Sequence, residues 1–196
     1  MGHGMRFFFV IDHKHNYRYF SSEPVHPVQV KFSKSRKIWE EAKKKLMFVS
    51  KKTLSQEQAF ERALKHESPS LEIIHSDLHE EKKIKVRFFF FLQRQRTRHI
   101  AMLAGEAILV PVTGLAALLP GPNILFYALA LLMIIQWRAF RGINRTLHRD
   151  HHFIADPLLA EWERAVEERR EDDYPALLTR LEETHGLRDL RKILWK

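Results

Sequence analysis

The hydrophobic residues of the chain are concentrated in one stretch, Ile100 to Trp137, in which Glu106 is the single charged side chain. The segment Pro120 to Asn123 (PGPN) divides this stretch into two runs, as expected of a tight turn between helices. Arginines precede and follow the stretch, which is typical of segments that border a membrane. The pattern predicts a membrane hairpin of two apolar helices over residues 100–140, with its turn at 120–123. The expected membrane-interface anchors are Arg94, Arg96, Arg98, Trp137, Arg138 and Arg141.

The lengths of the two runs leave two forms of the hairpin open. Ile100 to Leu119 has 20 residues, which as a helix would cover about 30 Å, the thickness of the hydrocarbon core. Ile124 to Trp137 has only 14 residues, or about 21 Å as a helix. The second arm would therefore either span a thinned bilayer or turn back within it. The alternative to both forms is a soluble protein with two buried core helices.

The residues before the apolar stretch show both strand and helix patterns. Aromatic and β-branched residues at 5–11 and 17–20 predict a β-hairpin, and residues 71–75 predict a third strand. Between them, apolar positions at helical spacing alternate with lysines, which predicts a basic amphipathic helix. A further helix is expected to run from Asp77 into the apolar stretch without a break. The residues expected to bind anionic lipid headgroups are Lys43, Lys44 and Lys45.

The residues after the apolar stretch predict helices. Asp156 and Pro157 form a strong helix start, and Gly186 is expected to end a second helix in the left-handed conformation. The predicted fold class is a mostly α-helical membrane protein with a two-helix apolar hairpin, a small α/β N-terminal region and a helical C-terminal tail. The predicted divisions are a soluble α/β region at 1–76, a basic lead-in helix at 77–99, the membrane hairpin at 100–140 and the helical tail at 141–196.

Charge and composition narrow the classes of function. Residues 1–99 carry 21 Lys and Arg against 11 Asp and Glu, a net charge of +10, whereas residues 138–196 carry 12 of each sign. The chain has no cysteine, which excludes disulfides, thiol nucleophiles and cysteine-held metals. The sequence has no phosphate-binding loop or nucleophile elbow, so we expect no catalytic residues, no cofactor and no enzyme activity. A metal site is not expected either, because a full ligand set is lacking around the helically spaced His148, His151 and His152.

Several short motifs in and around the apolar stretch resemble those of one family. They are Arg96-Thr97-Arg98-His99, Pro111-Val112-Thr113, Pro120-Gly121-Pro122-Asn123, Phe126-Tyr127, Trp137-Arg138-Ala139 and Gly142. Together they resemble the hydrophobic segment of the mitochondrial potassium/proton exchange-related family, over the range from Arg94 to Gly142. The resemblance implies an integral inner-membrane protein needed for potassium/proton exchange, and it supplies no catalytic residues. A bacterial plasma-membrane relative fits the sequence as well as a mitochondrial one. In either case, both termini are expected on the cytoplasmic or matrix side.

One helical face carries polar residues that could move an ion. His99, Glu106 and Thr113 are seven residues apart, so they point nearly the same way along one helix. A carboxyl group in hydrocarbon tends to be protonated, so Glu106 could carry a proton with His99 as its relay. Asn123 at the turn could offer an oxygen ligand to potassium. These four residues form the predicted ion pathway.

Each of these residues also has a structural interpretation. Glu106 could pair with Arg98 or Arg138, and Asn123 could cap the second helix. Two helices cannot enclose an aqueous path, so transport would need a homo-oligomer or a membrane protein partner. The predicted function is a contribution to potassium/proton exchange or its regulation. The alternative is a membrane-anchored adaptor that binds the lipid bilayer and protein partners, without specific nucleic-acid binding, since the lysine-rich helix lacks stacking aromatics.

Overall fold

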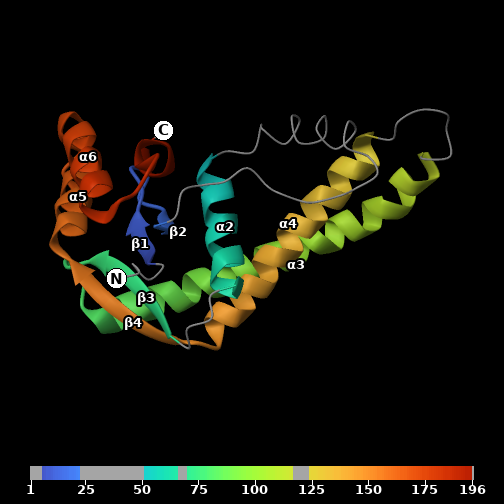
Figure 1. Cartoon of the computed structure of the whole chain (residues 1–196), viewed down its shortest axis with the longest axis horizontal. Coiled ribbons are helices and arrows are strands. Elements are labelled where there is room, and N and C mark those ends of the chain that lie inside the picture. The colour runs from blue at the N-terminus through green and yellow to red at the C-terminus, as the bar shows by residue number, and fades with distance from the viewer. Residues whose placement is uncertain (1–5, 23–50, 66–69, 117–123, 196) are drawn as a thin grey trace.

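The computed structural model describes residues 6–22, 51–65, 70–116 and 124–195. In these residues, four strands form one sheet, and helices pack on both of its faces (Figure 1). The elements in chain order are β1 (Phe7–Ile11), β2 (Tyr17–Ser21), α2 (Lys51–Lys65), β3 (Ser70–Ser76), α3 (Glu81–Ala116), α4 (Ile124–Leu147), β4 (Asp150–Asp156), α5 (Pro157–Glu167) and α6 (Tyr174–His185), with short helical turns at Glu171–Asp173 and Arg191–Trp195.

The sheet has the strand order β2-β1-β3-β4. β1 and β2 are antiparallel neighbours, which confirms the predicted hairpin, and β3 confirms the predicted third strand. β3 runs parallel to β1 and to β4, with Ser70 aligned with Asp150 and Ser76 with Asp156. Parallel neighbours need a crossover connection, and α3 and α4 form the one between β3 and β4. The segments before and after these two helices therefore meet in one sheet.

β1 is buried on both faces, which explains its unbroken apolar sequence. Successive side chains of a strand point to opposite faces. Phe8 and Val10 join a core with α5 and α6, whereas Phe7 and Phe9 join a second core with α2, α3 and α4. Figure 1 shows α5 and α6 on one side of β1 and β2, and α2 on the other. The sheet is thus the middle layer of three.

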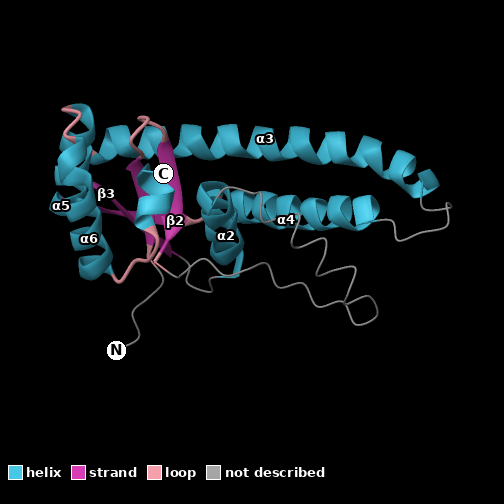
Figure 2. Ribbon diagram, turned by 90° about the horizontal axis from the view of Figure 1, so that it is seen from above, coloured by secondary structure: helices cyan, strands magenta, loops and turns pink. Residues whose placement is uncertain are grey.

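α3 is one continuous helix of 36 residues that packs on two different partners. In its first half, Ile84, Phe88 and Leu92 are buried in the core beside the sheet. Its second half extends beyond the sheet and lies beside α4 (Figure 2). The helix expected to run into the apolar stretch without a break is present, but it begins at Glu81, after a turn at residues 77–80.

The predicted fold class is wrong, because the described residues form a mixed α/β fold around a four-stranded sheet. Among the helices of these residues, none is both long enough and apolar enough to cross a membrane. Arginines interrupt the middle of α3, and Glu106 lies in its apolar half. In α4, only fourteen residues precede Arg138. The membrane hairpin is therefore replaced by two helices that pack on each other and on the rest of the fold.

The C-terminal tail is not purely helical, since it contributes β4 to the sheet. The predicted helix boundaries within it are confirmed. The Asp156 carboxylate accepts a hydrogen bond from the backbone N–H of Leu159 at 2.9 Å, and α6 ends at Gly186 with a φ of 66°. Local capping patterns thus located these helices correctly, whereas the strand between them and α4 was missed.

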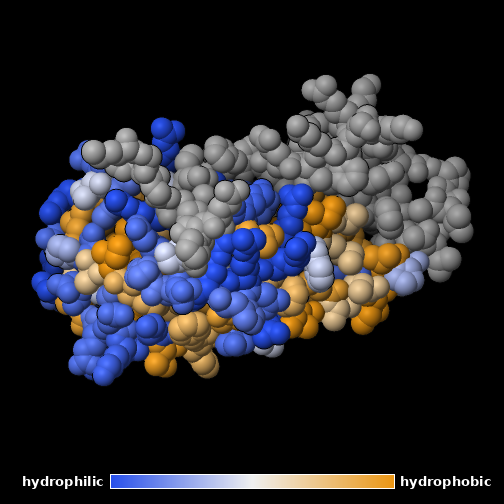
Figure 3. All heavy atoms as spheres, turned by 60° about the horizontal axis from the view of Figure 1, so that its bottom comes forward, coloured by the Kyte–Doolittle hydropathy of each residue, from blue (hydrophilic) through white to orange (hydrophobic). Residues whose placement is uncertain are grey.

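Hydrophobic side chains remain exposed on the helical pair. Figure 3 shows them over the parts of α3 and α4 that extend away from the sheet. Ile108 is 73% exposed, and Trp137 is 52% exposed and lies against Phe140, with ring centroids 5.8 Å apart. Part of the apolar signal in the sequence therefore comes from side chains that the fold leaves exposed.

Candidate proton-binding site

α2 and α4 approach each other very closely at Gly142. A Cβ atom on Gly142 would lie 2.0 Å from the backbone oxygen of Phe60, so only glycine permits this crossing. Ala59 and Ala63 of α2 and Ala139 of α4 are also buried here, and their small side chains suit the short distance between the helices. The crossing packs α2 closely against α4.

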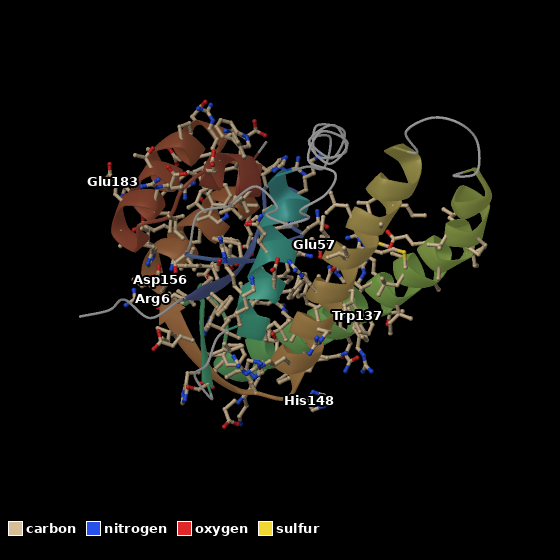
Figure 4. All side chains as sticks on the ribbon, turned by 45° about the vertical axis from the view of Figure 1, so that its right-hand side comes forward. Arg6, Glu57, Trp137, His148, Asp156 and Glu183 are labelled. Carbon is tan, nitrogen blue, oxygen red and sulfur yellow. The ribbon has the colours of Figure 1, made fainter. Side chains whose placement is uncertain are left out.

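Three polar side chains from three helices meet in this packed region. Glu57 of α2 lies with its Oε2 atom 3.3 Å from Nε2 of His99 on α3, and Figure 4 shows Glu57 on the side of α2 that faces α4. The other ring nitrogen of His99, Nδ1, is hydrogen-bonded to Oε1 of Gln136 on α4. Their exposed fractions are 6% for Glu57, 1% for His99 and 6% for Gln136. We call these three residues the Glu57 cluster.

Burial determines the protonation of the Glu57 cluster. It raises the pKa of Glu57 to about 8, although the positive charge of Arg98 opposes the shift. Burial also lowers the pKa of His99; the hydrogen bond to Gln136 opposes this change and Arg98 reinforces it. Both groups are therefore uncharged at neutral pH, and together they hold one proton.

The neutral forms complete a chain of hydrogen bonds. The amide oxygen of Gln136 can only accept, so Nδ1 of His99 must carry the hydrogen and Nε2 must accept. The protonated carboxyl of Glu57 can then donate to Nε2, which gives a partner to two buried atoms that otherwise have none among the described residues. Loss of the proton would leave a buried carboxylate against a neutral imidazole, an unfavourable arrangement. The Glu57 cluster is thus suited to bind and release one proton.

The sequence contained a signal for the two missed members of the cluster. Glu57 precedes Phe60 by three residues and Leu64 by seven, so it shares their apolar helical face. Gln136 likewise precedes the buried Ala139 by three residues and the buried Ile143 by seven. A polar residue on a buried face normally needs a polar partner, which is the pattern that could have identified both.

The predicted ion pathway stays a prediction, and of its four residues the structure describes the side chains of His99 and Glu106. His99 is a central member of the Glu57 cluster, and Glu106 lies two turns further along α3. One carboxylate oxygen of Glu106 is buried without a hydrogen-bond partner among the described residues, and burial raises its pKa. The alternative pairing with Arg138 is not found, because Arg138 instead contacts Glu61 at 3.2 Å. Thr113 lies in the last two turns of α3, and Asn123 lies outside the described residues.

The other residues singled out in the sequence have different surroundings. Arg94 and Arg98 are exposed and line a cavity beside α3. Arg96 is half-buried and Arg141 is exposed. The predicted lipid-binding lysines, Lys43, Lys44 and Lys45, lie outside the described residues.

The expected helical spacing of His148, His151 and His152 is wrong. His151 and His152 belong to β4, where neighbouring side chains point to opposite faces, so the three do not converge. His151 packs against the rings of Phe88 and Phe89, at centroid distances of 5.4 and 5.3 Å. Within the described ranges, no group of three or more His, Asp or Glu side chains could hold a metal ion.

A second buried glutamate lies on the other side of the sheet. Glu163 of α5 is 1% exposed, and its Oε2 atom lies 3.5 Å from Nε2 of His79. Its Oε1 atom accepts a long hydrogen bond, 3.5 Å, from the backbone N–H of Ile11. Burial raises the pKa of Glu163, and hydrogen bonds from Ser76 and Ile11 oppose that shift. This carboxyl group is therefore held by the sheet as well as by a histidine.

Comparison with known proteins identifies the family of the chain. A family model described as mitochondrial K+-H+ exchange-related matches residues 13–148. This range is longer than the Arg94 to Gly142 segment on which the sequence resemblance rested, and it contains all three residues of the Glu57 cluster. No curated protein and no solved structure matches the chain.

Proposed function

Because the chain belongs to the mitochondrial K+-H+ exchange-related family, we propose that it takes part in potassium/proton exchange as the proton-sensing component of a larger system. The observation that carries this proposal is the buried Glu57 carboxyl group, whose pKa is raised to about 8. A group with such a pKa changes its protonation just above neutral pH. An ordinary glutamate, with a pKa near 4.5, would stay ionised throughout this range.

The position of the Glu57 cluster favours sensing over conduction. All three side chains are buried in helix packing, so proton binding acts directly on the contacts of α2 with α3 and α4. When the cluster holds its proton, the chain of hydrogen bonds joins the three helices. When the proton leaves, the buried charge on Glu57 weakens the docking of α2. We propose that this change in docking passes the pH signal to a separate transporter protein.

The decisive test is potassium/proton exchange in mitochondria that lack this protein. Potassium-dependent proton flux is measured with a matrix pH dye after complementation with the wild type, Glu57→Gln or Glu61→Gln. Glu61 is a matched control, because it lies one turn from Glu57 on α2 but forms salt bridges with Lys65 and Arg138 at the surface. Each variant is checked for expression and for a native circular dichroism spectrum.

We expect the wild type to restore a flux whose pH dependence has a midpoint near 8. Glutamine imitates the protonated carboxyl, so Glu57→Gln should give a flux that no longer changes across this midpoint. Glu61→Gln should behave like the wild type. Normal flux in the absence of the protein would refute a role in exchange. A normal pH midpoint in Glu57→Gln would refute Glu57 as the sensor.

A further inference from the structure

An open cavity of about 770 Å³ lies beside the Glu57 cluster, between the β1–β2 turn and α3. This volume is within the range of pockets that bind small molecules and cofactors. One face of α3 supplies Arg87, Phe90, Phe91, Arg94, Gln95 and Arg98. The opposite wall comes from residues 15–18 and from Gln56 of α2.

The lining of this cavity is strongly basic. Its described residues include four arginines and no acidic side chain. Arg18 is already neutralised, since its guanidinium donates to the Asp12 carboxylate at 2.8 and 2.7 Å. Arg87 donates a hydrogen bond to the Tyr17 hydroxyl at 2.7 Å, and this neutral partner does not cancel its charge. Arg94 and Arg98 form no hydrogen bond or ion pair with any residue that the structure describes.

Aromatic and amide groups lie among these arginines. The Phe90 ring is 71% exposed and lies in the cavity wall, where a flat ligand could stack on it. Tyr17 and Phe91 lie nearby in the cavity wall. The side-chain oxygen of Gln95 is buried and has no hydrogen-bond partner among the described residues. A ligand with a flat aromatic ring and an N–H donor would satisfy both features.

We propose that this cavity binds a nucleoside polyphosphate, with its phosphates on Arg94 and Arg98 and its base against Phe90 and Gln95. Guanidinium groups bind phosphate oxygens in pairs of parallel hydrogen bonds, and exposed rings stack on bases. The phosphorylated headgroup of a lipid shares the phosphate chemistry and is separated from a free nucleotide by the test below.

The ligand would also act on the proton of the Glu57 cluster, a consequence that rests on the proposed sensing function. Arg98 lines the cavity and directly precedes His99, and Gln56 lines it and directly precedes Glu57. The charge of Arg98 favours proton loss from both Glu57 and His99. On the α4 side of the cluster, Gln136 carries no charge, and the charge of Arg138 is compensated by its salt bridge with Glu61. Phosphates on Arg98 would cancel its effect, so ligand binding would be accompanied by proton uptake and would be tighter at lower pH.

Isothermal titration calorimetry with ATP tests the site itself. We expect binding by the wild-type full chain and a loss of roughly tenfold or more in affinity for Arg94→Ala and for Arg98→Ala. Arg141→Ala is the control, because this arginine is exposed on α4 and does not line the cavity. Absence of ATP binding, or an equal loss in Arg141→Ala, would overturn the proposal.

Two further arms identify the ligand class. Phe90→Ala should weaken ATP but leave inorganic triphosphate unchanged, because only the nucleotide has a base; equal effects on both would overturn the base contact. Phosphatidylcholine vesicles with an anionic phospholipid form the lipid arm. Vesicle binding that depends on Arg94 and Arg98, without binding of ATP, would replace the nucleotide by a lipid headgroup.

The coupling is measured by repeating the ATP titration in buffers of different ionisation enthalpy. The wild type should take up protons near pH 8, and Glu57→Gln should bind ATP without this uptake. Binding of ATP by the wild type without proton uptake would refute the coupling. This result would leave the sensing function intact, since that function is tested separately by the flux measurements.

Discussion

The two buried glutamates, Glu57 and Glu163, differ in how their surroundings hold the carboxyl group. Both lie near a histidine, at 3.3 Å from His99 and 3.5 Å from His79, and burial raises the pKa of both. Glu163 also receives hydrogen bonds from the sheet, which stabilise its carboxylate form. Among the described residues, the imidazole of His99 is the one polar group in contact with the Glu57 carboxyl, so we expect Glu57 to hold its proton more strongly than Glu163 does. The number of fixed donors thus distinguishes a structural carboxyl group from one suited to sensing.

Gly142→Ala should have the largest effect, because it forces α2 away from α4 and so disrupts the surroundings of Glu57 but not those of Glu163. The added methyl would overlap the Phe60 backbone, so α2 must move away from α4. We expect a loss of roughly 2–4 kcal/mol in the free energy of unfolding, measured with urea. Gly105→Ala is the control, since a Cβ there meets no atom within 4 Å. It should gain about 0.5–1 kcal/mol through its higher helix propensity. Equal stability of the two variants would show that the close crossing is not required.

Glu57→Gln should change the pH dependence of stability. The pKa of Glu57 is raised from 4.5 in the unfolded chain to about 8 in the fold. The folded state therefore keeps the proton over a range in which the unfolded state loses it. This contribution to stability is fully present below pH 4.5 and is lost as the pH rises through about 8. Glutamine cannot ionise, so the variant should lack this loss, and urea unfolding from pH 5 to 9 would measure the difference. Parallel curves for variant and wild type would contradict the raised pKa.

Glu163→Gln should show a smaller change with the same sign. Its pKa is also raised, so its contribution to stability likewise declines as the pH increases. Because Ser76 and Ile11 stabilise the carboxylate, the decline should be weaker than for Glu57. Comparing the two variants by urea unfolding over the same pH range tests this order directly. A larger change in the pH dependence of stability for Glu163→Gln than for Glu57→Gln would contradict this order.

Glu106→Gln should have the smallest effect. The residue is only partly buried, although burial raises its pKa. We expect stability to change by less than about 0.5 kcal/mol at pH 7, as for most surface substitutions. The same variant tests the predicted ion pathway in the flux assay. Unchanged flux together with unchanged stability would remove Glu106 from the mechanism and leave the Glu57 cluster.

The sequence predicted the elements whose signals are local. The β-hairpin and the third strand follow from runs of aromatic and β-branched residues. The start of α5 and the end of α6 follow from a capping aspartate and a left-handed glycine. β4 was missed because its sequence, DHHFIAD, has few apolar residues. Its partner β3 lies about 80 residues earlier in the chain. Pairing at such a distance depends on the whole fold, which local patterns do not describe.

The prediction of a membrane hairpin for the apolar stretch also failed because a local pattern does not describe the surroundings of a segment. Hydropathy reports that side chains avoid water, but it does not say whether lipid or protein covers them. Likewise, Gly142 carried no local signal of a helix crossing, and the crossing is what brings Glu57 to His99. His99 was identified from its helical alignment with Glu106, whereas its actual partners come from two other helices.

The continuity of α3 gives the molecule a mechanical lever. His99 lies near its middle, and the 17 residues from there to Ala116 form an arm of about 26 Å. The first half of the helix is fixed in the core beside the sheet, and the second half extends away from the sheet (Figure 2). His99 of the Glu57 cluster therefore lies near the point where the helix leaves this core. A tilt of about 5° at this point would displace the far end by roughly 2 Å, given the rise per residue of an α-helix. Binding or release of a single proton near His99 would thus displace the outer end of the helical pair.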